Sequence, residues 1–334
     1  MNKANRIGIV GGGAWGTALA VAAHNAGAET LLWARNKAIV DHINREHENT
    51  AYLPGMKLPE QLLASSTMQP LADCDTALMV VPTQQLRAVF AELMQFWPAD
   101  KPLILCAKGI ERQSGLLPAG IIRDIRPNQV VAALSGPSFA VDVVAGKPTA
   151  VSLAADTMAR SEALCQMLAS PFFRPYAGDD LAGVEIGGAL KNVTAVCCGI
   201  AAGRALGASA GAALMARGFS EMVRYGVAHG ALAETFMGLS GFGDLVLTCS
   251  SSQSRNFSFG FGLGAGTLDI GDALEGRVPL AEGAFTASIA ARTARTKGLD
   301  LPILQTVSEI LEGTIGIGAA IHRLLERPLK SEKL

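Results

Sequence analysis

Short apolar runs recur through the first half of the chain and alternate with longer stretches that have a helical pattern. Strands are expected at residues 6–10, 30–34, 76–82, 102–109, 130–137 and 149–155, and helices at residues 14–26 and 157–169. Continuously apolar strands separated by helices are typical of a parallel sheet that is covered on both faces. This half therefore predicts an α/β domain with a mostly parallel sheet.

The pattern changes near residues 178–180, and the second half contains Ala- and Gly-rich helical stretches. Helices are expected at residues 181–202, 210–228, 286–297, 301–311 and 319–325, with the Ser/Gly-rich interval 250–266 interrupting them. A chain of 334 residues is long enough for two domains, because one domain usually takes about 100–200 residues. We predict a domain at residues 1–179 and a mainly α-helical domain at residues 180–334.

Three glycines stand between the first expected strand and the first expected helix. Gly11, Gly13 and Gly16 have the spacing Gly-x-Gly-x-x-Gly. In a Rossmann-like domain these glycines permit a tight turn, let a diphosphate approach the backbone, and allow the helix to pack closely on the strand. The phosphates would face the N–H groups at the helix start, near Ala14 and Trp15. We predict a Rossmann-like dinucleotide-binding domain; the alternative is a glycine turn that binds no ligand.

The uncharged length of this segment also allows a different interpretation. Residues 7–28 contain no Asp, Glu, Lys or Arg and follow Lys3 and Arg6, a pattern shared with export signals and membrane spans. However, the three consecutive glycines at 11–13 lie in the middle, and His24 and Asn25 are polar. The sequence therefore favours a cofactor turn, and we expect no stable membrane insertion.

The residue after the second expected strand bears on the choice of cofactor. Domains that bind only NAD usually have an acid there, which holds the ribose hydroxyls. This chain has Arg35, whose guanidinium can bind the 2′-phosphate of NADP(H) in a bidentate manner. We predict that NADP(H) is accepted beside or in preference to NAD(H); the alternative is a solvated arginine at the edge of the adenine.

Charge and cysteine content exclude several classes of function. The formal net charge is -1 with the cations scattered along the chain, so we expect no nucleic-acid partner and no polybasic membrane surface. The six cysteines form no CxxC pair and lie far in sequence from the five histidines. We therefore expect no metal site, and we expect buried free thiols in a reducing cytoplasm.

Several motifs along the whole chain resemble one family. The segments "GGGAWGTALA", "CAKGIE", "LSGPSFA", "GGALKNVTAV", "GFGDLVLTCSSSQSRNFSFG" and "LAEGAFTA" occur in this order. This set resembles the bacterial-type NAD(P)-dependent glycerol-3-phosphate dehydrogenases. The resemblance implies reversible reduction of dihydroxyacetone phosphate, a phosphorylated triose, to sn-glycerol 3-phosphate for phospholipid synthesis. It also implies a cytoplasmic enzyme, and together with the Ala-rich helices it suggests a homodimer.

Reduction of a ketone requires a proton donor near the carbonyl as well as a hydride. Lys191 lies in the otherwise uncharged helical segment "GGALKNV", where desolvation would lower the pKa of its ammonium toward neutrality. The resemblance makes Lys191 the acid in reduction and the base in oxidation; the alternative is a lysine that extends from a packed helix to solvent. Asp244 would orient Lys191 or, alternatively, cap a helix. Lys108 follows a strand and would bind substrate and cofactor, unless it is an ordinary loop lysine.

The remaining candidates lie in loops. Ser254, Arg255 and Asn256 offer a hydroxyl, a guanidinium and an amide that suit a phosphate dianion, with Arg255 also within reach of the cofactor; the alternative is a solvated polar loop. Further candidates that the resemblance implies are Gly136 and Ser138 for the substrate, and Ala140, Leu280 and Glu282 for the cofactor. The first two could instead form a plain β-turn, and Glu282 could cap a helix. Ala14 stands where the family often has Ser.

Two other functions remain open. The first is another two-domain dehydrogenase, of the 3-hydroxyacid or 6-phosphogluconate type, which would need a carboxylate-binding site. The second is a non-catalytic dinucleotide sensor, which would keep the glycine turn but would have no reason to keep Lys191 and Asp244. The Ser254–Asn256 loop favours a phosphorylated ketone.

Overall fold

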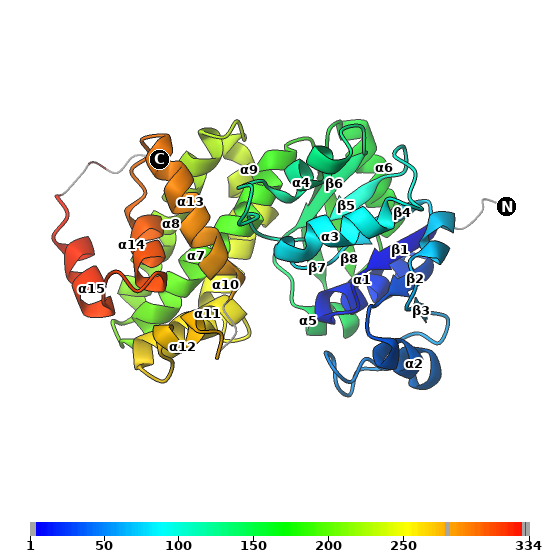
Figure 1. Ribbon diagram of the computed structural model, residues 1–334, viewed down its shortest axis with the longest axis horizontal. Coiled ribbons are helices and arrows are strands. Elements are labelled where there is room, and N and C mark those ends of the chain that lie inside the picture. The colour runs from blue at the N-terminus through cyan, green and yellow to red at the C-terminus, as the bar shows by residue number, and fades with distance from the viewer. Residues whose placement is uncertain (1–4, 278–280, 329–330, 332–334) are drawn as a thin grey trace. The chain divides into compact units, whose positions relative to one another are not determined.

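The chain forms two compact units. The computed structural model describes residues 5–277, 281–328 and 331, and Figure 1 shows the path of the chain. Unit 1 comprises Met1–Ala107 and Leu116–Leu181, and unit 2 comprises Lys108–Gly115 and Ala182–Leu334. The sequence-based boundary at 179/180 falls two residues before the end of unit 1, and it did not anticipate that the 108–115 segment joins unit 2. The limits of independently folding domains stay a prediction.

Unit 1 is an eight-stranded sheet in the order β3-β2-β1-β4-β5-β6-β7-β8. The strands are β1 (Arg6–Val10), β2 (Glu29–Trp33), β3 (Leu63–Ser65), β4 (Thr76–Met79), β5 (Leu103–Leu105), β6 (Val131–Ser135), β7 (Thr149–Ala155) and β8 (Phe173–Gly178). The helices are α1 (Ala14–Asn25), α2 (Lys37–Glu46), the 3-10 turn η1 (Gln69–Asp73), α3 (Thr83–Leu93), α4 (Pro118–Ile125), α5 (Ala140–Val144) and α6 (Met158–Leu168). All neighbours pair in parallel except β6 and β7. The predicted Rossmann-like, mostly parallel sheet is confirmed.

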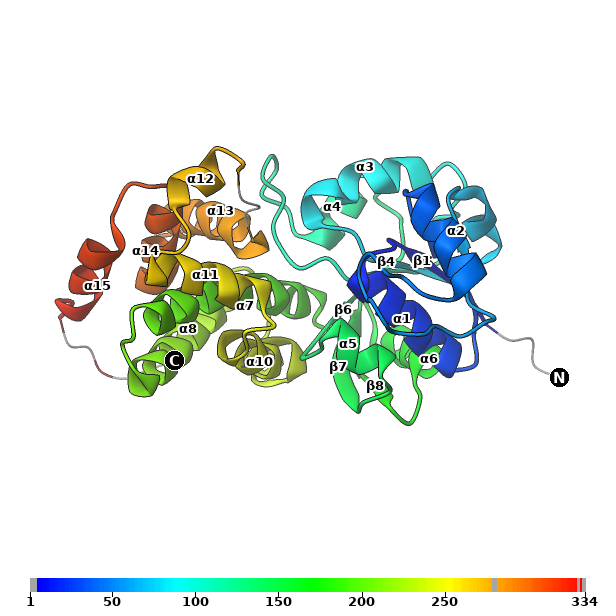
Figure 2. The same ribbon diagram turned by 90° about the horizontal axis from the view of Figure 1, so that it is seen from below.

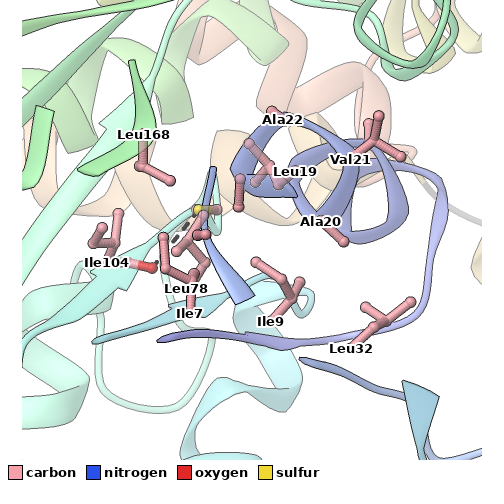
Figure 3. Close-up of a cluster of buried hydrophobic side chains, with 14 of the residues drawn as sticks. Ile7, Ile9, Leu19, Ala20, Val21, Ala22, Leu32, Leu78, Ile104 and Leu168 are labelled. Atoms are coloured by element: carbon pink, nitrogen blue, oxygen red, sulfur yellow. Dashed lines mark hydrogen bonds between the residues drawn. The ribbon is translucent and has the colours of Figure 1, made fainter. Parts of the chain in front are cut away.

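Helices cover both faces of this sheet, as Figure 2 shows for α3 and α4 on one side and α1, α5 and α6 on the other. The alternation of side chains along each strand creates the two cores. In β1, for example, Ile7 and Ile9 pack with α1, whereas Val10 packs on the face covered by α3 and α4. Figure 3 shows the first of these cores, where Leu19 of α1 and Leu168 of α6 lie with the strand residues.

The strand order places the glycine turn where this class of sheet binds its ligands. The order reverses at β1, since β2 lies on one side of β1 and β4 on the other. In open α/β sheets a crevice forms at such a reversal, outside the carboxyl ends of the strands. The turn after Val10 lies at this position. Residues 7–28, whose uncharged length allowed an export signal, are the buried strand β1, the turn and helix α1.

Unit 2 is mainly helical, as predicted. Its elements are α7 (Leu181–Gly203), α8 (Ala208–Val227), α9 (Ala233–Met237), the π-helical turn η2 (Leu239–Gly243), α10 (Asp244–Ser250), α11 (Arg255–Ala265), α12 (Ile270–Leu274), α13 (Glu282–Thr296), α14 (Pro302–Leu311) and α15 (Ile317–Leu325). Helix α7 is long and apolar enough to cross a membrane, but 83% of its most apolar window is buried inside the structure. It is therefore the central core helix of this unit.

The interval 250–266 was expected to interrupt the helices, and this expectation is wrong for most of its length. Residues Arg255–Ala265 form α11, which packs against α7 through glycines of both helices. A Cβ added at Gly260 would lie 2.1 Å from the carbonyl oxygen of Val196, and one at Gly199 would lie 2.1 Å from that of Phe257. The glycines that suggested a loop instead allow two helix backbones to touch.

Candidate active site

Of the three glycines of the Gly-x-Gly-x-x-Gly motif, the fold requires Gly11 and Gly16 but not Gly13. Gly11 has a φ of 131°, and a Cβ there would lie 2.2 Å from the carbonyl oxygen of Val80. A Cβ on Gly16 would lie 1.7 Å from the carbonyl oxygen of Gly11. A Cβ on Gly13, by contrast, would meet no atom within 4 Å. Gly13 therefore leaves open space above the backbone, which suits the approach of a diphosphate.

The start of α1 has the electrostatic character of an anion site. Gly13 is its N-cap and supplies no side-chain hydrogen bond, and the first turn contains no acidic residue. The free N–H groups and the positive end of the helix dipole favour a phosphate there. Trp15 and Ala140, two of the predicted cofactor residues, both pack against the same core of unit 1. The residues of the turn thus fit a dinucleotide.

Arg35 lies beside this turn. The N–H of Gly11 donates to the carbonyl oxygen of Trp33 at 3.0 Å. A Cβ added at Gly12 would lie 2.4 Å from the Cβ of Ala34. The exposed Arg35 is the next residue. The turn and the end of β2 are therefore in direct contact, and the role of Arg35 in cofactor choice stays a prediction.

Asn49 is a residue of this site that the sequence analysis missed. Its side chain is 1% exposed, and its Nδ2 donates to the carbonyl oxygen of Gly12 at 3.0 Å and to Oγ1 of Thr17 at 2.8 Å. Asn49 therefore ties the loop after α2 to the glycine turn and to α1. No spacing or motif in the sequence singles it out.

In the loop after β6, the backbone of Gly136 packs closely against the neighbouring strand β7. A Cβ on Gly136, whose φ is 154°, would lie 2.8 Å from Cα of Val151 on β7. The hydroxyl of Ser138 donates to the carbonyl oxygen of Gly136 at 3.1 Å. The close backbone approach at Gly136 is thus to a neighbouring strand, and a contact of Gly136 or Ser138 with substrate stays a prediction.

Unit 2 brings three of the predicted catalytic residues together. Nζ of Lys191, on α7, lies 2.5 Å from Oδ1 of Asp244, the first residue of α10. Nζ of Lys108, in the 108–115 segment, lies 2.8 Å from Oδ2 of the same carboxylate. Lys191 and Asp244 are buried, and the Lys108 side chain is 17% exposed. One buried carboxylate therefore holds two ammonium groups.

Thr248 completes this cluster and was also missed by the sequence analysis. Nζ of Lys191 donates to Oγ1 of Thr248 at 2.9 Å, and that hydroxyl donates to Oδ1 of Asp244 at 3.3 Å. Thr248 follows Asp244 by four residues on α10, so both side chains lie on one face of the helix. That spacing was legible in "DLVLT" and could have predicted the contact.

The geometry excludes two of the alternatives. Lys191 does not extend to solvent, because its Nζ is hydrogen bonded inside the unit. Asp244 does not cap α10, because the N-cap is Gly243 and the Asp244 carboxylate accepts from Lys108, Lys191 and Thr248.

Burial and charge set the protonation of this cluster. Burial lowers the pKa of Lys191 to about 8, against the opposing effect of the Asp244 charge, and the charge of Lys108 lowers it further. Burial alone would raise the pKa of Asp244, but the charges and hydrogen bonds of Lys108 and Lys191 hold it below its usual value. The expected lowering of the Lys191 pKa is confirmed. An ammonium with this pKa can both donate and accept a proton near neutral pH.

The Ser254–Asn256 segment lies at the start of α11, and the side chains of Ser254 and Asn256 form hydrogen bonds within unit 2. The hydroxyl of Ser254 accepts from the N–H of Phe257 at 3.3 Å as the N-cap. Asn256 donates to Oδ1 of Asn192 and accepts from the N–H of Gly283, each at 2.9 Å. Arg255 is exposed, so its guanidinium remains accessible to an anion at a helix N-terminus.

Of the two cofactor candidates Glu282 and Leu280, the structure describes only Glu282. Glu282 is the first residue of α13, and burial raises its pKa, although the charges of Arg255, Lys108 and Lys191 act in the opposite direction. Glu282 thus belongs to the electrostatic surroundings of the lysine cluster. Leu280 lies outside the described residues. Among the residues that the structure describes, no group of three or more His, Cys, Asp or Glu could hold a metal ion.

Two family models match the chain, one to each half. The model described as "NAD-dependent glycerol-3-phosphate dehydrogenase N-terminus" matches residues 6–161, and the model described as the C-terminus matches residues 180–322. The N-terminal match contains the glycine turn, and the C-terminal match contains Lys191, Asp244 and Thr248.

Full-length relatives and a solved structure agree with these matches. The chain is 48% identical to a glycerol-3-phosphate dehydrogenase [NAD(P)+] 1 of Sphingopyxis alaskensis, with 99% of each chain covered. It is 51% identical to a glycerol-3-phosphate dehydrogenase [NAD(P)+] of Beijerinckia indica, also with 99% of each chain covered. The crystal structure of glycerol-3-phosphate dehydrogenase from Coxiella burnetii is 35% identical with a TM-score of 0.90, over 97% of this chain and 99% of that chain.

Proposed function

Because the chain belongs to the NAD-dependent glycerol-3-phosphate dehydrogenase family, we propose that it reduces dihydroxyacetone phosphate to sn-glycerol 3-phosphate, reversibly, with NADPH or NADH. The observation that carries the chemical part of this proposal is the buried Lys191, whose pKa of about 8 suits proton transfer at neutral pH. The full-length relatives whose names include NAD(P)+ support the choice of cofactors.

Lys191 is the proton donor in reduction. When bound, the reduced nicotinamide supplies the hydride to the carbonyl carbon. Nζ of Lys191 gives a proton to the carbonyl oxygen, and the same amine removes that proton in the reverse direction. Asp244 keeps the ammonium charged before transfer and is joined by Thr248 in fixing the position of Nζ. Lys108, held on the other oxygen of Asp244, polarises the carbonyl with a second positive charge.

Arg255 binds the phosphate of the substrate. Its exposed guanidinium stands at the first turn of α11, where the helix dipole also favours an anion. Lys108, Lys191 and Arg255 carry three positive charges against the two carboxylates of Asp244 and Glu282. This part of unit 2 therefore has an excess of positive charge. A dianionic triose phosphate matches that excess better than a neutral or monocarboxylate substrate.

The cofactor site, the use of the product and the oligomeric state belong to the same proposal. Unit 1 binds the dinucleotide, with Gly13, Ala14 and Trp15 at the diphosphate and Arg35 at the 2′-phosphate. The product supplies glycerophospholipid synthesis in the cytoplasm, and the enzyme works as a homodimer. The exposed apolar side chains of α8 and α9, among them Val227 and Met237, support the homodimer.

The first experiment follows the loss of reduced-nicotinamide absorbance when dihydroxyacetone phosphate is the substrate. With a 3-hydroxyacid or 6-phosphogluconate, which would be oxidised, it follows the gain of that absorbance. We expect turnover only with the triose phosphate. Turnover of a hydroxyacid instead would select the other dehydrogenase type. Cofactor binding without any turnover would select the non-catalytic sensor.

The second experiment tests the role of Lys191. We expect Lys191→Ala to lower kcat by about 10²–10⁴-fold, the usual contribution of a positioned general acid. Binding of NADPH, measured by fluorescence titration, should be retained. The matched control is Lys297→Ala, which removes an exposed lysine of the same unit whose Nζ donates to the carbonyl oxygen of Ala228. Near-normal turnover of Lys191→Ala would remove this residue from the mechanism.

The third experiment locates the phosphate. We expect Arg255→Lys to raise KM for dihydroxyacetone phosphate by about 10–100-fold, because a lysine cannot reproduce the two parallel hydrogen bonds of a guanidinium. Arg292→Lys, at an exposed position of α13, is the control and should leave KM unchanged. An unchanged KM for Arg255→Lys would place the phosphate elsewhere.

A further inference from the structure

Two cysteines of unit 2 share a cavity beside the lysine cluster. The cavity has a volume of about 570 Å³ and is formed by α7, α8, α10, α11 and the turn between α7 and α8. Its lining includes Cys198, Ala202, Gly207, Met215, Cys249 and Ser250. Both thiols are otherwise buried, with 3% exposure each, so the cavity is their route to solvent solutes. A space of this size is ample for a molecule as small as a peroxide.

The two thiols are also in contact with each other. A hydrogen bond from the Cys249 thiol lowers the pKa of the Cys198 thiol, and the same bond raises the pKa of Cys249 well above its usual value. A lowered pKa increases the fraction of nucleophilic thiolate at Cys198. Cys197 differs from this pair: it is the preceding residue on α7, but burial raises the pKa of its thiol and it does not line the cavity. Burial likewise raises the pKa of Cys165, in unit 1, to about 11.

The position of the pair links it to the lysine cluster. Cys198 follows Lys191 by seven residues, two turns of α7, so the two side chains lie on one face of the helix. Cys249 directly follows Thr248, whose hydroxyl contacts both Lys191 and Asp244. The same two helices therefore carry the proton-transfer group and, beside it, the two thiols.

We propose that Cys198 and Cys249 are a redox-sensitive dithiol that hydrogen peroxide converts to a disulfide, with loss of the dehydrogenase activity. The Cys198 thiolate attacks one peroxide oxygen: an S–O bond forms, the O–O bond breaks, and the second oxygen leaves as water with the thiol proton. The Cys249 sulfur then displaces the oxygen from Cys198: the S–S bond forms, the S–O bond breaks, and a second water leaves. Two thiols are oxidised and both peroxide oxygens are reduced.

The disulfide would disturb the catalytic geometry through α10. An S–S bond of about 2 Å is much shorter than a hydrogen-bonded thiol contact, so the bond draws Cys249 toward α7. Thr248 and Asp244 move with it, and Nζ of Lys191 loses its position. A displacement of about 1 Å in a catalytic group can cost about 10²-fold in rate. The effect on activity rests on the proposed function of Lys191, whereas the formation of the disulfide does not.

The test exposes the purified full-length protein to hydrogen peroxide and maps its thiols by mass spectrometry without reduction. We expect a cross-link between the tryptic peptides at residues 192–204 and 225–255, which contain Cys198 and Cys249. Because Cys197 lies in the first peptide, Cys197→Ala is the matched variant and should give the same cross-link. We expect activity to fall by about 10²-fold and to return with dithiothreitol. Cys198→Ala should resist peroxide.

Each contrary result has a distinct meaning. If both thiols stay unmodified, or if the cross-link disappears in Cys197→Ala, the dithiol assignment is overturned. If Cys198→Ala is inactivated as fast as the wild type, the link to activity is overturned. An enzyme that lacks the proposed activity would still form the cross-link, so failure of the proposed function is recognised separately.

Discussion

Replacing Asp244 by Asn tests how the buried carboxylate sets the pKa of Lys191. The side chain keeps its size and an oxygen that can accept a hydrogen bond, but its charge is removed. In the wild type the charge of Asp244 opposes the lowering effect of burial on the pKa of Lys191. In the variant burial remains and the charge of Lys108 is no longer balanced, so the pKa of Lys191 must fall below about 8.

The size of the effect follows from the geometry. At the 2.5 Å separation of Nζ and Oδ1, the Coulomb attraction is at most about 7 kcal/mol with an effective dielectric constant of about 20. The remaining hydrogen bonds to Thr248 and to the new amide oxygen reduce the net loss. A net loss of about 3 kcal/mol lowers the pKa by about 2 pH units. At pH 7.5 the protonated fraction of Lys191 then drops from about three quarters to about 3%, roughly a 25-fold decrease.

The assay is kcat/KM for reduction of dihydroxyacetone phosphate between pH 5.5 and 9.5. The wild type should lose activity as pH rises through about 8, because the amine is no longer protonated to act as the acid. In Asp244→Asn this decline should begin about 2 pH units lower, with partial recovery of activity at pH 5.5–6. Asp142→Asn, which removes a partly exposed carboxylate paired with Lys147, is the control. An unshifted decline in Asp244→Asn would refute this account of Lys191.

Three further changes have defined outcomes. Arg35→Asp should raise KM for NADPH more than that for NADH, because an acid repels the 2′-phosphate; equal losses would refute the assignment. Gly264→Ala should lower the unfolding free energy by about 1–3 kcal/mol, because its Cβ would lie 2.3 Å from the carbonyl oxygen of Ile200, whereas Gly211→Ala, with nothing within 4 Å, should not destabilise. Burial raises the pKa of Glu221 to about 7, above its unfolded value, so its contribution to the unfolding free energy is lost as pH rises from about 4.5 through 7. The stability difference between wild type and Glu221→Gln, measured by urea unfolding, should therefore shrink over that range; a constant difference would contradict the raised pKa.

The sequence predicted six of the eight strands of unit 1 and its helices α1 and α6, because these elements carry local signals. The strand at Thr149–Ala155 and the helix that begins at Ala14 were placed with the correct starting residues. Strands β3 and β8 and helices α2, α3, α4 and α5 were not predicted. Strand β3, for example, has only three residues and no apolar run. Helix α11 was missed because glycine has low intrinsic helix propensity. The close contact between the backbones of α11 and α7 explains why α11 contains glycines.

The sequence by itself determined the alternation of strands and helices in the first half, the glycine turn and the presence of one lysine in the otherwise uncharged segment "GGALKNV". These features depend on residues close together along the chain. The tertiary structure decided which distant groups meet, such as Lys108 and Lys191 on the two oxygens of Asp244. It also gave Asn49 its place at the glycine turn. Such contacts depend on how helices and strands pack, and the resulting burial is what lowers the pKa of Lys191.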